Sequence, residues 1–142
     1  MTEFISDVKK IPHSDSLVFK VLSDLSNLEL LKDKIPENKV SNFTCDTDSC
    51  SFSVDPVGNV RFVIIDREPN KTIKFKAEDV PFDINVWIQL VSKGENETFL
   101  KLTIKADLNV FIKSMVSKPI EEGLDKISEM IAELSYEKFA VE

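Results

Sequence analysis

The sequence predicts an α+β fold in which a curved antiparallel sheet of seven strands wraps around one long C-terminal helix. Three observations predict it. Between Val40 and Ala106, apolar and polar residues alternate with a period of two, which is typical of strands with one buried face. Short turn signals separate these strands, so neighbours are expected to pair antiparallel. A single apolar stripe at helical spacing then runs from Val110 to about Tyr136.

Composition places the chain among ordinary globular proteins. It has 142 residues, of which 42% are hydrophobic and 30% charged, so we expect one domain over residues 1–142. The net charge is −7, and lysines are spread along the chain. This charge argues against nucleic acids and anionic membrane surfaces as partners, because both attract basic patches.

Signals for export, membrane insertion and cofactors are not found in the sequence. The N-terminal residues lack a basic segment followed by an apolar run, and no stretch approaches the roughly 18 consecutive apolar residues of a membrane helix. These observations predict a cytoplasmic protein without membrane insertion. The chain has no glycine-rich phosphate loop, and Asp46-Thr47-Asp48 lacks the further ligands of a calcium loop. We therefore expect no metal and no cofactor.

The first strand is predicted over residues 3–11. This segment carries β-type residues until Pro12, and the alternation puts Phe4, Ser6 and Val8 on one face.

Two short helices are predicted between the first and second strands. Ser14 is a good N-cap for a helix to about residue 24, because its hydroxyl can accept from free backbone amides. Ser26 is expected to cap a second helix through residue 34, before Pro36.

The last helix is expected to begin after Asn109, a plausible N-cap. Pro119 lies inside it and removes a backbone donor, which predicts a kink or short break near Val116. Gly123 is expected to allow close packing against the sheet. A helix of this length can cover a whole small domain, so we expect it to act as a lid over the inner face of the sheet.

The space between this lid and the sheet is the candidate binding site. A small hydrophobic molecule could occupy it, or the apolar side chains could fill it themselves, and the sequence leaves both alternatives open. The residues expected to line the space are Phe52, Val54, Phe62, Ile64, Phe75, Val86, Ile88, Leu102, Ile104, Phe111, Met115, Ile120, Leu124 and Ile127.

The order of one strand, two short helices, six strands and a long helix resembles the helix-grip fold of the SRPBCC superfamily. That superfamily includes START lipid-transfer domains, polyketide cyclases and the major birch pollen allergen. Residues 108–113, then 115–119 and Gly123-Leu124, are similar to small bacterial members. The resemblance implies an interior cavity under the C-terminal helix and no settled activity. Residues 55–59 depart from the longer Gly-rich loop of the plant allergens, so plant-type ligands are not implied.

Candidate catalytic residues are few. The single histidine, His13, has no nucleophile that the sequence places beside it. Asp66 and Ser6 are the only polar candidates near the inward faces, and Tyr136 is the only tyrosine. We therefore expect binding without catalysis; the alternative is an enzyme of the polyketide cyclase or dehydratase type that uses Asp66 or Tyr136 as an acid or base.

Cys45 and Cys50 flank a predicted four-residue hairpin loop. A cross-strand disulfide is geometrically conceivable, but a reducing cytoplasm favours two free, buried thiols.

The outer face of the sheet is expected to carry more apolar side chains than a wet face needs: Val63, Ile65, Trp87, Val91 and Phe99. A contiguous patch of these residues would indicate a homodimer through the outer face, or a co-chaperone-like module that binds another protein.

Overall fold

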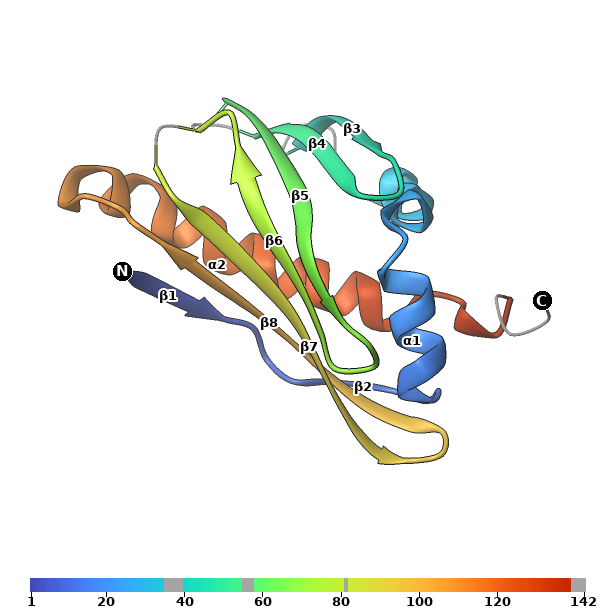
Figure 1. The fold of residues 1–142 in the computed structure, drawn as a ribbon. Helices are drawn as coiled ribbons and strands as arrows, with labels where there is room; N and C mark the ends of the chain where they lie inside the picture. The colour runs from blue at the N-terminus through green and yellow to red at the C-terminus, as the bar shows by residue number, and fades with distance from the viewer. Residues whose placement is uncertain (35–39, 55–57, 81, 139–142) are drawn as a thin grey trace.

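The computed structural model describes residues 1–34, 40–54, 58–80 and 82–138, except for the side chains of residues 30–34, 40 and 54 (Figure 1). The strands are β1 (Thr2–Ile5), β2 (Lys9–Ile11), β3 (Val40–Cys45), β4 (Ser49–Val54), β5 (Gly58–Glu68), β6 (Thr72–Glu78), β7 (Ile84–Gly94) and β8 (Glu97–Ala106). The α-helices are α1 (Asp15–Leu22) and α2 (Val110–Ala132), and the 3-10 helices are η1 (Leu25–Lys34) and η2 (Tyr136–Lys138).

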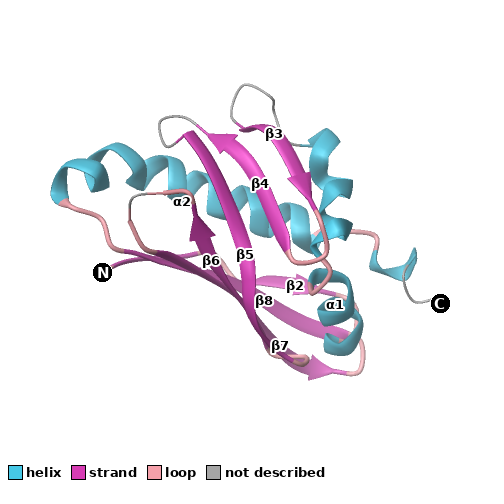
Figure 2. Ribbon diagram, turned by 45° about the horizontal axis from the view of Figure 1, so that its top comes forward, coloured by secondary structure: helices cyan, strands magenta, loops and turns pink. Residues whose placement is uncertain are grey.

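The described strands form one antiparallel sheet in the order β1-β8-β7-β6-β5-β4-β3, with β2 also paired to β8. The long helix α2 crosses one face of this sheet, and its backbone comes closest to β8, β1 and β2 (Figures 1 and 2). The predicted α+β helix-grip architecture is therefore confirmed. The sheet has eight strands rather than seven because the first predicted strand is divided into β1 and β2.

The division of the first strand changes which side chains face inward. Ile5 pairs with Thr103 and Lys9 pairs with Leu100, so the N-terminal segment contains one residue more than the β8 segment opposite it. An inserted residue reverses the inward and outward positions that follow it. Phe4 is therefore buried before the insertion, whereas Val8 is 59% exposed, and its predicted place beside Phe4 is wrong.

Side-chain caps begin both α-helices as predicted. Ser14 Oγ accepts a hydrogen bond from the Leu17 N–H at 3.2 Å, and Asn109 Oδ1 accepts one from the Ile112 N–H at 2.9 Å. The predicted cap at Ser26 is wrong, because η1 begins at Leu25 and the Ser26 side chain donates to Asp24.

Helix α2 differs from the prediction in three respects. It runs as one continuous helix through Pro119, so the predicted alternative of a short break near Val116 is wrong, while a kink stays a prediction. It ends at Ala132 rather than near Tyr136. A Cβ placed on Gly123 would meet no atom within 4 Å, so the expectation that this glycine permits close packing against the sheet is also wrong.

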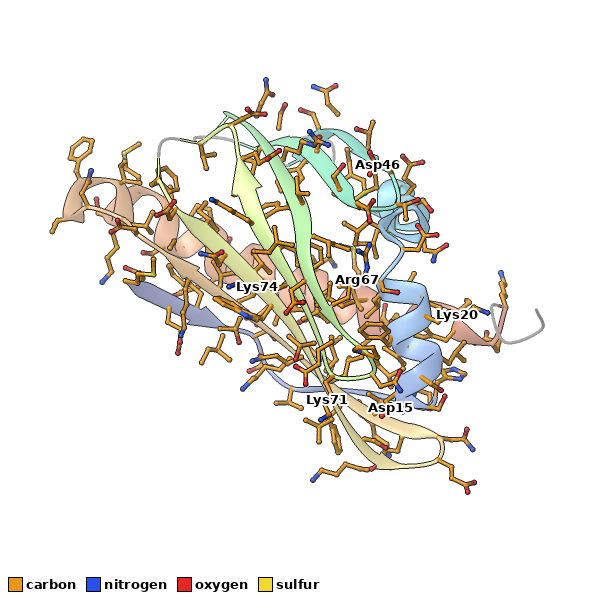
Figure 3. All side chains as sticks on the ribbon, viewed as in Figure 1. Asp15, Lys20, Asp46, Arg67, Lys71 and Lys74 are labelled. Carbon is orange, nitrogen blue, oxygen red and sulfur yellow. A yellow bond between two sulfur atoms is a disulfide. The ribbon has the colours of Figure 1, made fainter. Side chains whose placement is uncertain are left out.

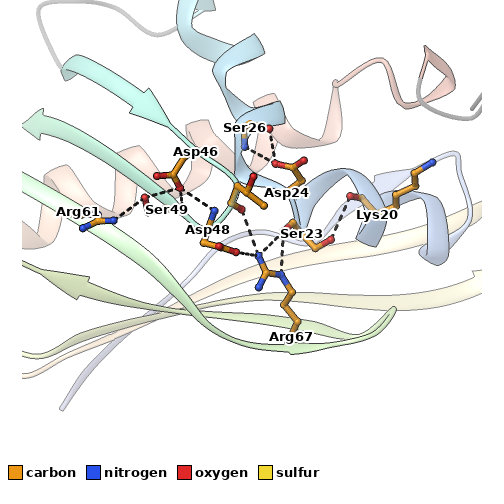
Figure 4. A network of polar contacts seen from close by, with 10 residues as sticks. Lys20, Ser23, Asp24, Ser26, Asp46, Asp48, Ser49, Arg61 and Arg67 are labelled. Carbon is orange, nitrogen blue, oxygen red and sulfur yellow. Dashed lines mark hydrogen bonds and ion pairs between the residues drawn. The ribbon is translucent and has the colours of Figure 1, made fainter.

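A β-bulge in β5 moves Arg67 to the inner side of the sheet. The pairing shifts between Ile64 and Asp66, which leaves Ile65 as the extra residue and places Arg67 opposite the buried Ile73. From there the Arg67 guanidinium donates to the Ser23 carbonyl at 3.0 and 3.1 Å (Figure 4). It also contacts Asp48 Oδ1 at 2.5 Å. Arg67 thus joins the end of α1 to the β3–β4 turn.

Cys45 and Cys50 form a disulfide across the β3–β4 hairpin, with their Cα atoms 4.1 Å apart. The favoured expectation of two free thiols is therefore wrong, while the predicted pairing of the two residues across the hairpin is right. Cys50 is buried in the main core cluster, so the disulfide ties edge strand β3 to the core.

Candidate functional site

Helix α2 packs against the sheet unevenly along its length. From Leu124 onward its inward side chains are buried, including Ser128 and Ile131, and Tyr136 follows them into the core. In the first half of the helix only Val116 is buried. The first turns extend beyond the sheet (Figure 1), and Phe111 there is 75% exposed.

The inner face of the sheet shows a matching region of incomplete burial. Among the partly buried apolar residues that pack against the core, five belong to the residues predicted to line the space between the sheet and the helix; we call these five the half-buried apolar set. They are Phe52 of β4, Phe62 of β5, Val86 of β7, Ile104 of β8 and Ile120 of α2.

Aromatic rings gather on the β4–β5 side of this set. The Phe52 and Phe62 rings are stacked, with centroids 5.8 Å apart, and the Phe43 ring lies 6.3 Å from that of Phe52. These side chains make the inner face of the sheet apolar, and part of their surface is exposed to solvent.

The structure divides the fourteen predicted lining residues into groups. Five are the half-buried apolar set itself. The fully buried group is Ile64, Phe75, Ile88, Leu102 and Leu124. The exposed group is Phe111, Met115 and Ile127, at 75%, 47% and 42%. The Val54 side chain lies outside the described residues.

The exposed positions of Phe111 and Met115 follow from helix geometry. Each residue of an α-helix turns by about 100°, so the five-residue step from Met115 to Ile120 rotates the side chain by about 140°. The two residues before that step therefore lie on a different face of α2 from Ile120 and Leu124. Val116 occupies the inward position instead and is 3% exposed.

The polar residues considered for catalysis have structural contacts. Asp66 is exposed on the outer face of the sheet, opposite Lys74. Ser6 Oγ accepts a hydrogen bond from the Leu102 N–H at 2.9 Å, and this bond holds the segment between β1 and β2 to β8. The Tyr136 hydroxyl donates to the Ile131 carbonyl at 2.8 Å, and burial raises the pKa of the Tyr136 phenol far above its usual value. His13 lies beside Tyr136 and Glu137.

The β3–β4 turn is organised by Asp46 (Figure 4). Its carboxylate accepts from the Ser49 hydroxyl and from the backbone N–H groups of Asp48 and Ser49. The Ser49 hydroxyl first, and then the Asp48 N–H, lower the pKa of Asp46 below its usual range. The Asp46 carboxylate is therefore used in hydrogen bonds that hold the turn together.

Two shallow hollows open elsewhere on the described surface. One of about 350 Å³ lies over β1, β7 and β8, and one of about 460 Å³ lies over the outer side of β3, β4 and β5. Neither is lined by the half-buried apolar set. Within the described ranges, no group of three or more His, Cys, Asp and Glu side chains is arranged to hold a metal ion. No helix in the same part of the chain is long and apolar enough to cross a membrane.

Comparison with solved structures supports the fold. Norcoclaurine synthase from Thalictrum flavum, in complex with dopamine and hydroxybenzaldehyde, superposes with a TM-score of 0.68 at 16% identity, over 96% of this chain and 88% of that one. A START superfamily protein from Mycobacterium smegmatis gives 0.55 at 11% identity, over 88% and 98%. An HSP90 activator from Plasmodium falciparum gives 0.52 at 19% identity, over 74% and 73%. At these identities the likeness concerns the fold alone.

Sequence comparison places the chain more specifically. A comparison with curated proteins finds no match. Residues 9–137, which is most of the chain, match the family model of CoxG, a carbon monoxide dehydrogenase subunit. The predicted resemblance to the SRPBCC superfamily is confirmed by this match and by the shared fold. The chain therefore belongs to the carbon monoxide dehydrogenase CoxG family, within the SRPBCC helix-grip superfamily.

Proposed function

We propose that this protein binds a small hydrophobic molecule, lipid or polyketide-like in character, between the inner face of the sheet and the first half of α2. Folds of this type commonly bind hydrophobic ligands. The observation that carries the proposal is the half-buried apolar set, which joins side chains of the inner face of the sheet to Ile120 of α2 and leaves part of their apolar surface exposed. A ligand that covers these side chains gains about 25 cal/mol for each Å² of apolar surface removed from water.

The polar groups near the inner face favour binding over catalysis. Thr98 donates its hydroxyl to the His13 carbonyl, and Ser128 donates to the Asp125 carbonyl. Ser6 is occupied by its contact with β8. Among the described residues, every buried side-chain nitrogen and oxygen has a hydrogen-bond partner. A general acid or base needs a group free to exchange a proton with substrate, and these groups are committed to the fold.

The cyclase-type alternative has little support in these contacts. It depended on Asp66 or Tyr136. The Asp66 carboxylate lies on the face of the sheet opposite to α2, and the Tyr136 hydroxyl is held by a backbone carbonyl. Neither group can reach a molecule that contacts Val86 and Ile104 without a rearrangement of the sheet or of the end of α2.

Native mass spectrometry with a panel of fatty acids, sterols and aromatic polyketides tests the proposal. The test variant is Val86→Phe, which enlarges a side chain of the half-buried apolar set. The matched control is Val91→Phe, because Val91 is on the same strand but faces outward and is 52% exposed. We expect retention of at least one panel member by the natural protein and the control, and a loss of about tenfold in Val86→Phe.

Circular dichroism and thermal unfolding establish that both variants fold. If Val86→Phe proves unstable, Ile120→Phe enlarges the helix side of the same set. The proposal is rejected if no member of the panel is retained, or if the outward and inward variants lose binding equally.

A further inference from the structure

The outer face of the sheet gathers lysines that are scattered in the sequence. Lys74 and Lys76 lie on β6, and Lys101 and Lys105 lie on β8. They flank Trp87 of β7, whose direct neighbours across the sheet are Lys74 and Thr103. We call these four lysines and Trp87 the lysine patch. Figure 3 shows Lys74 on the face of the sheet turned away from α2.

The lysine patch is incompletely neutralised. Lys105 pairs with Glu3 of β1 at 3.5 Å, and Asp66 of β5 lies opposite Lys74 on the same face. Within the residues that the structure describes, neither Lys76 nor Lys101 makes an ion pair. The nearby Glu78 is engaged by Arg61 at 3.6 Å. The patch therefore presents positive charge on a protein whose net charge is −7.

An apolar contact point lies within the patch. The Lys74 and Lys105 ammonium groups are 5.2 and 5.6 Å from the centroid of the Trp87 ring. Beside Trp87 is the hollow of about 350 Å³, which is lined by the side chains of Ile5, Gln89 and Thr103 together with Glu3, Lys101 and Lys105. Ile5 is 53% exposed at its edge. The hollow is shallow, and Trp87 and Ile5 supply its apolar lining.

We infer that the lysine patch is a docking surface for an acidic segment of a partner protein that carries one large apolar side chain. The apolar side chain would occupy the hollow beside Trp87 and Ile5, and the acidic residues would face Lys76 and Lys101. Charged side chains arranged in this way steer association and fix orientation, and a central aromatic residue supplies most of the contact energy.

The charges favour this occupant over the other classes. A homodimer through this face would bring each patch against its own copy, because a two-fold interface pairs a surface with itself. The positive charges of Lys76 and Lys101 in one copy would then lie close to the same charges in the other copy. A membrane surface or a nucleic acid brings an extended array of negative charge, which the net charge of −7 repels, whereas a short acidic segment brings few charges and places them on the local patch.

Fluorescence anisotropy with a labelled, Glu-rich peptide that contains one central phenylalanine tests the inference on the full-length protein. The charge-reversal variant is Lys76→Glu with Lys101→Glu. The control is Lys113→Glu with Lys118→Glu, which makes the same net change on exposed positions of α2. We expect the first pair to weaken binding by about tenfold or more, and the control by less than about twofold.

Two further measurements make the test specific. Trp87→Thr should abolish the preference for the phenylalanine peptide over the same peptide with serine at that position. Binding should also weaken as the salt concentration rises. The inference is overturned if the peptide does not bind, if the control pair weakens binding equally, or if anionic vesicles or single-stranded RNA bind the patch more tightly. It is also overturned if light scattering gives a dimer mass that Trp87→Thr reduces to a monomer.

Discussion

The Tyr136 hydroxyl donates a hydrogen bond to the backbone carbonyl of Ile131 across 2.8 Å, in a place where neither residue is more than 2% exposed. The bond joins η2 to the last turn of α2. The helix ends at Ala132, and the segment that follows it places the tyrosine ring in the core.

Alkaline pH should destabilise the protein through this tyrosine. Burial raises the pKa of the folded-state phenol above its unfolded value near 10. Below pH 10 the phenol is protonated in both the folded and the unfolded state, so the stability that its burial contributes does not change with pH. Above pH 10 the unfolded state releases the proton while the folded state keeps it, so the free energy of unfolding falls by about 1.4 kcal/mol per pH unit.

Urea unfolding between pH 8 and pH 11, compared with Tyr136→Phe, measures this effect. The variant should be about 1 kcal/mol less stable near pH 8, because the hydrogen bond is lost. Its free energy of unfolding should then fall less steeply above pH 10 than that of the natural protein, because it has no tyrosine to titrate. Tyr136 is the only tyrosine in the chain, so the difference between the two curves reports this residue alone. Parallel curves for the two proteins would contradict the assignment.

Arg67 should stabilise the junction between α1 and the β3–β4 turn. Its planar guanidinium reaches the Ser23 carbonyl and Asp48 together, which a lysine ammonium cannot reproduce with the same geometry. Arg67→Lys should therefore lower the free energy of unfolding by about 1 kcal/mol, since the guanidinium is partly exposed. Chemical denaturation measures it. Arg61→Lys is the control and should change stability by less than about 0.5 kcal/mol; equal losses would argue against a specific role for Arg67.

The sequence predicted the elements whose signals are local. The caps at Ser14 and Asn109 depend on side chains that reach backbone amides three residues away, so their positions can be read directly. The strict alternation of β6 predicted the buried Ile73 and Phe75.

The sequence-based predictions were wrong where a single residue shifts which side chains of a strand or helix face inward. The insertion between β1 and β2 exposed Val8, and the bulge in β5 turned Arg67 inward, but neither leaves a clear sequence signal. In α2, the apolar residues Met115 and Ile120 are five residues apart, and this spacing places Met115 on an exposed face of the helix. The lysine patch was missed because its members come from different strands and meet only when the strands pair.

Gly123 should be replaceable by alanine with a gain in stability. It lies inside α2, where glycine is about 1 kcal/mol less favourable than alanine, and a Cβ would meet nothing within 4 Å. Thermal and urea unfolding of Gly123→Ala should show an increase of roughly 0.5–1 kcal/mol in the free energy of unfolding. A decrease would mean that the middle of α2 lies closer to the sheet than described.

The disulfide between Cys45 and Cys50 should contribute moderately to stability. It closes a short loop, for which the chain-entropy relation gives about 2 kcal/mol. The double variant Cys45→Ala with Cys50→Ala should lose about that amount, and reductant should lower the stability of the natural protein but not that of the variant. Titration of the denatured protein, purified without reductant, should detect no free thiol; two free thiols would contradict the bond.

Methyl-detected NMR of the isoleucine and valine side chains, during titration with a ligand identified by native mass spectrometry, tests the central claim most directly. The account predicts that the methyl signals of Val86, Ile104 and Ile120 shift together and saturate at one ligand per chain, while the exposed Ile65 and Val91 on the outer face do not move. Shifts confined to Ile65 and Val91, or binding that leaves Val86, Ile104 and Ile120 unperturbed, would contradict a ligand site between the sheet and α2.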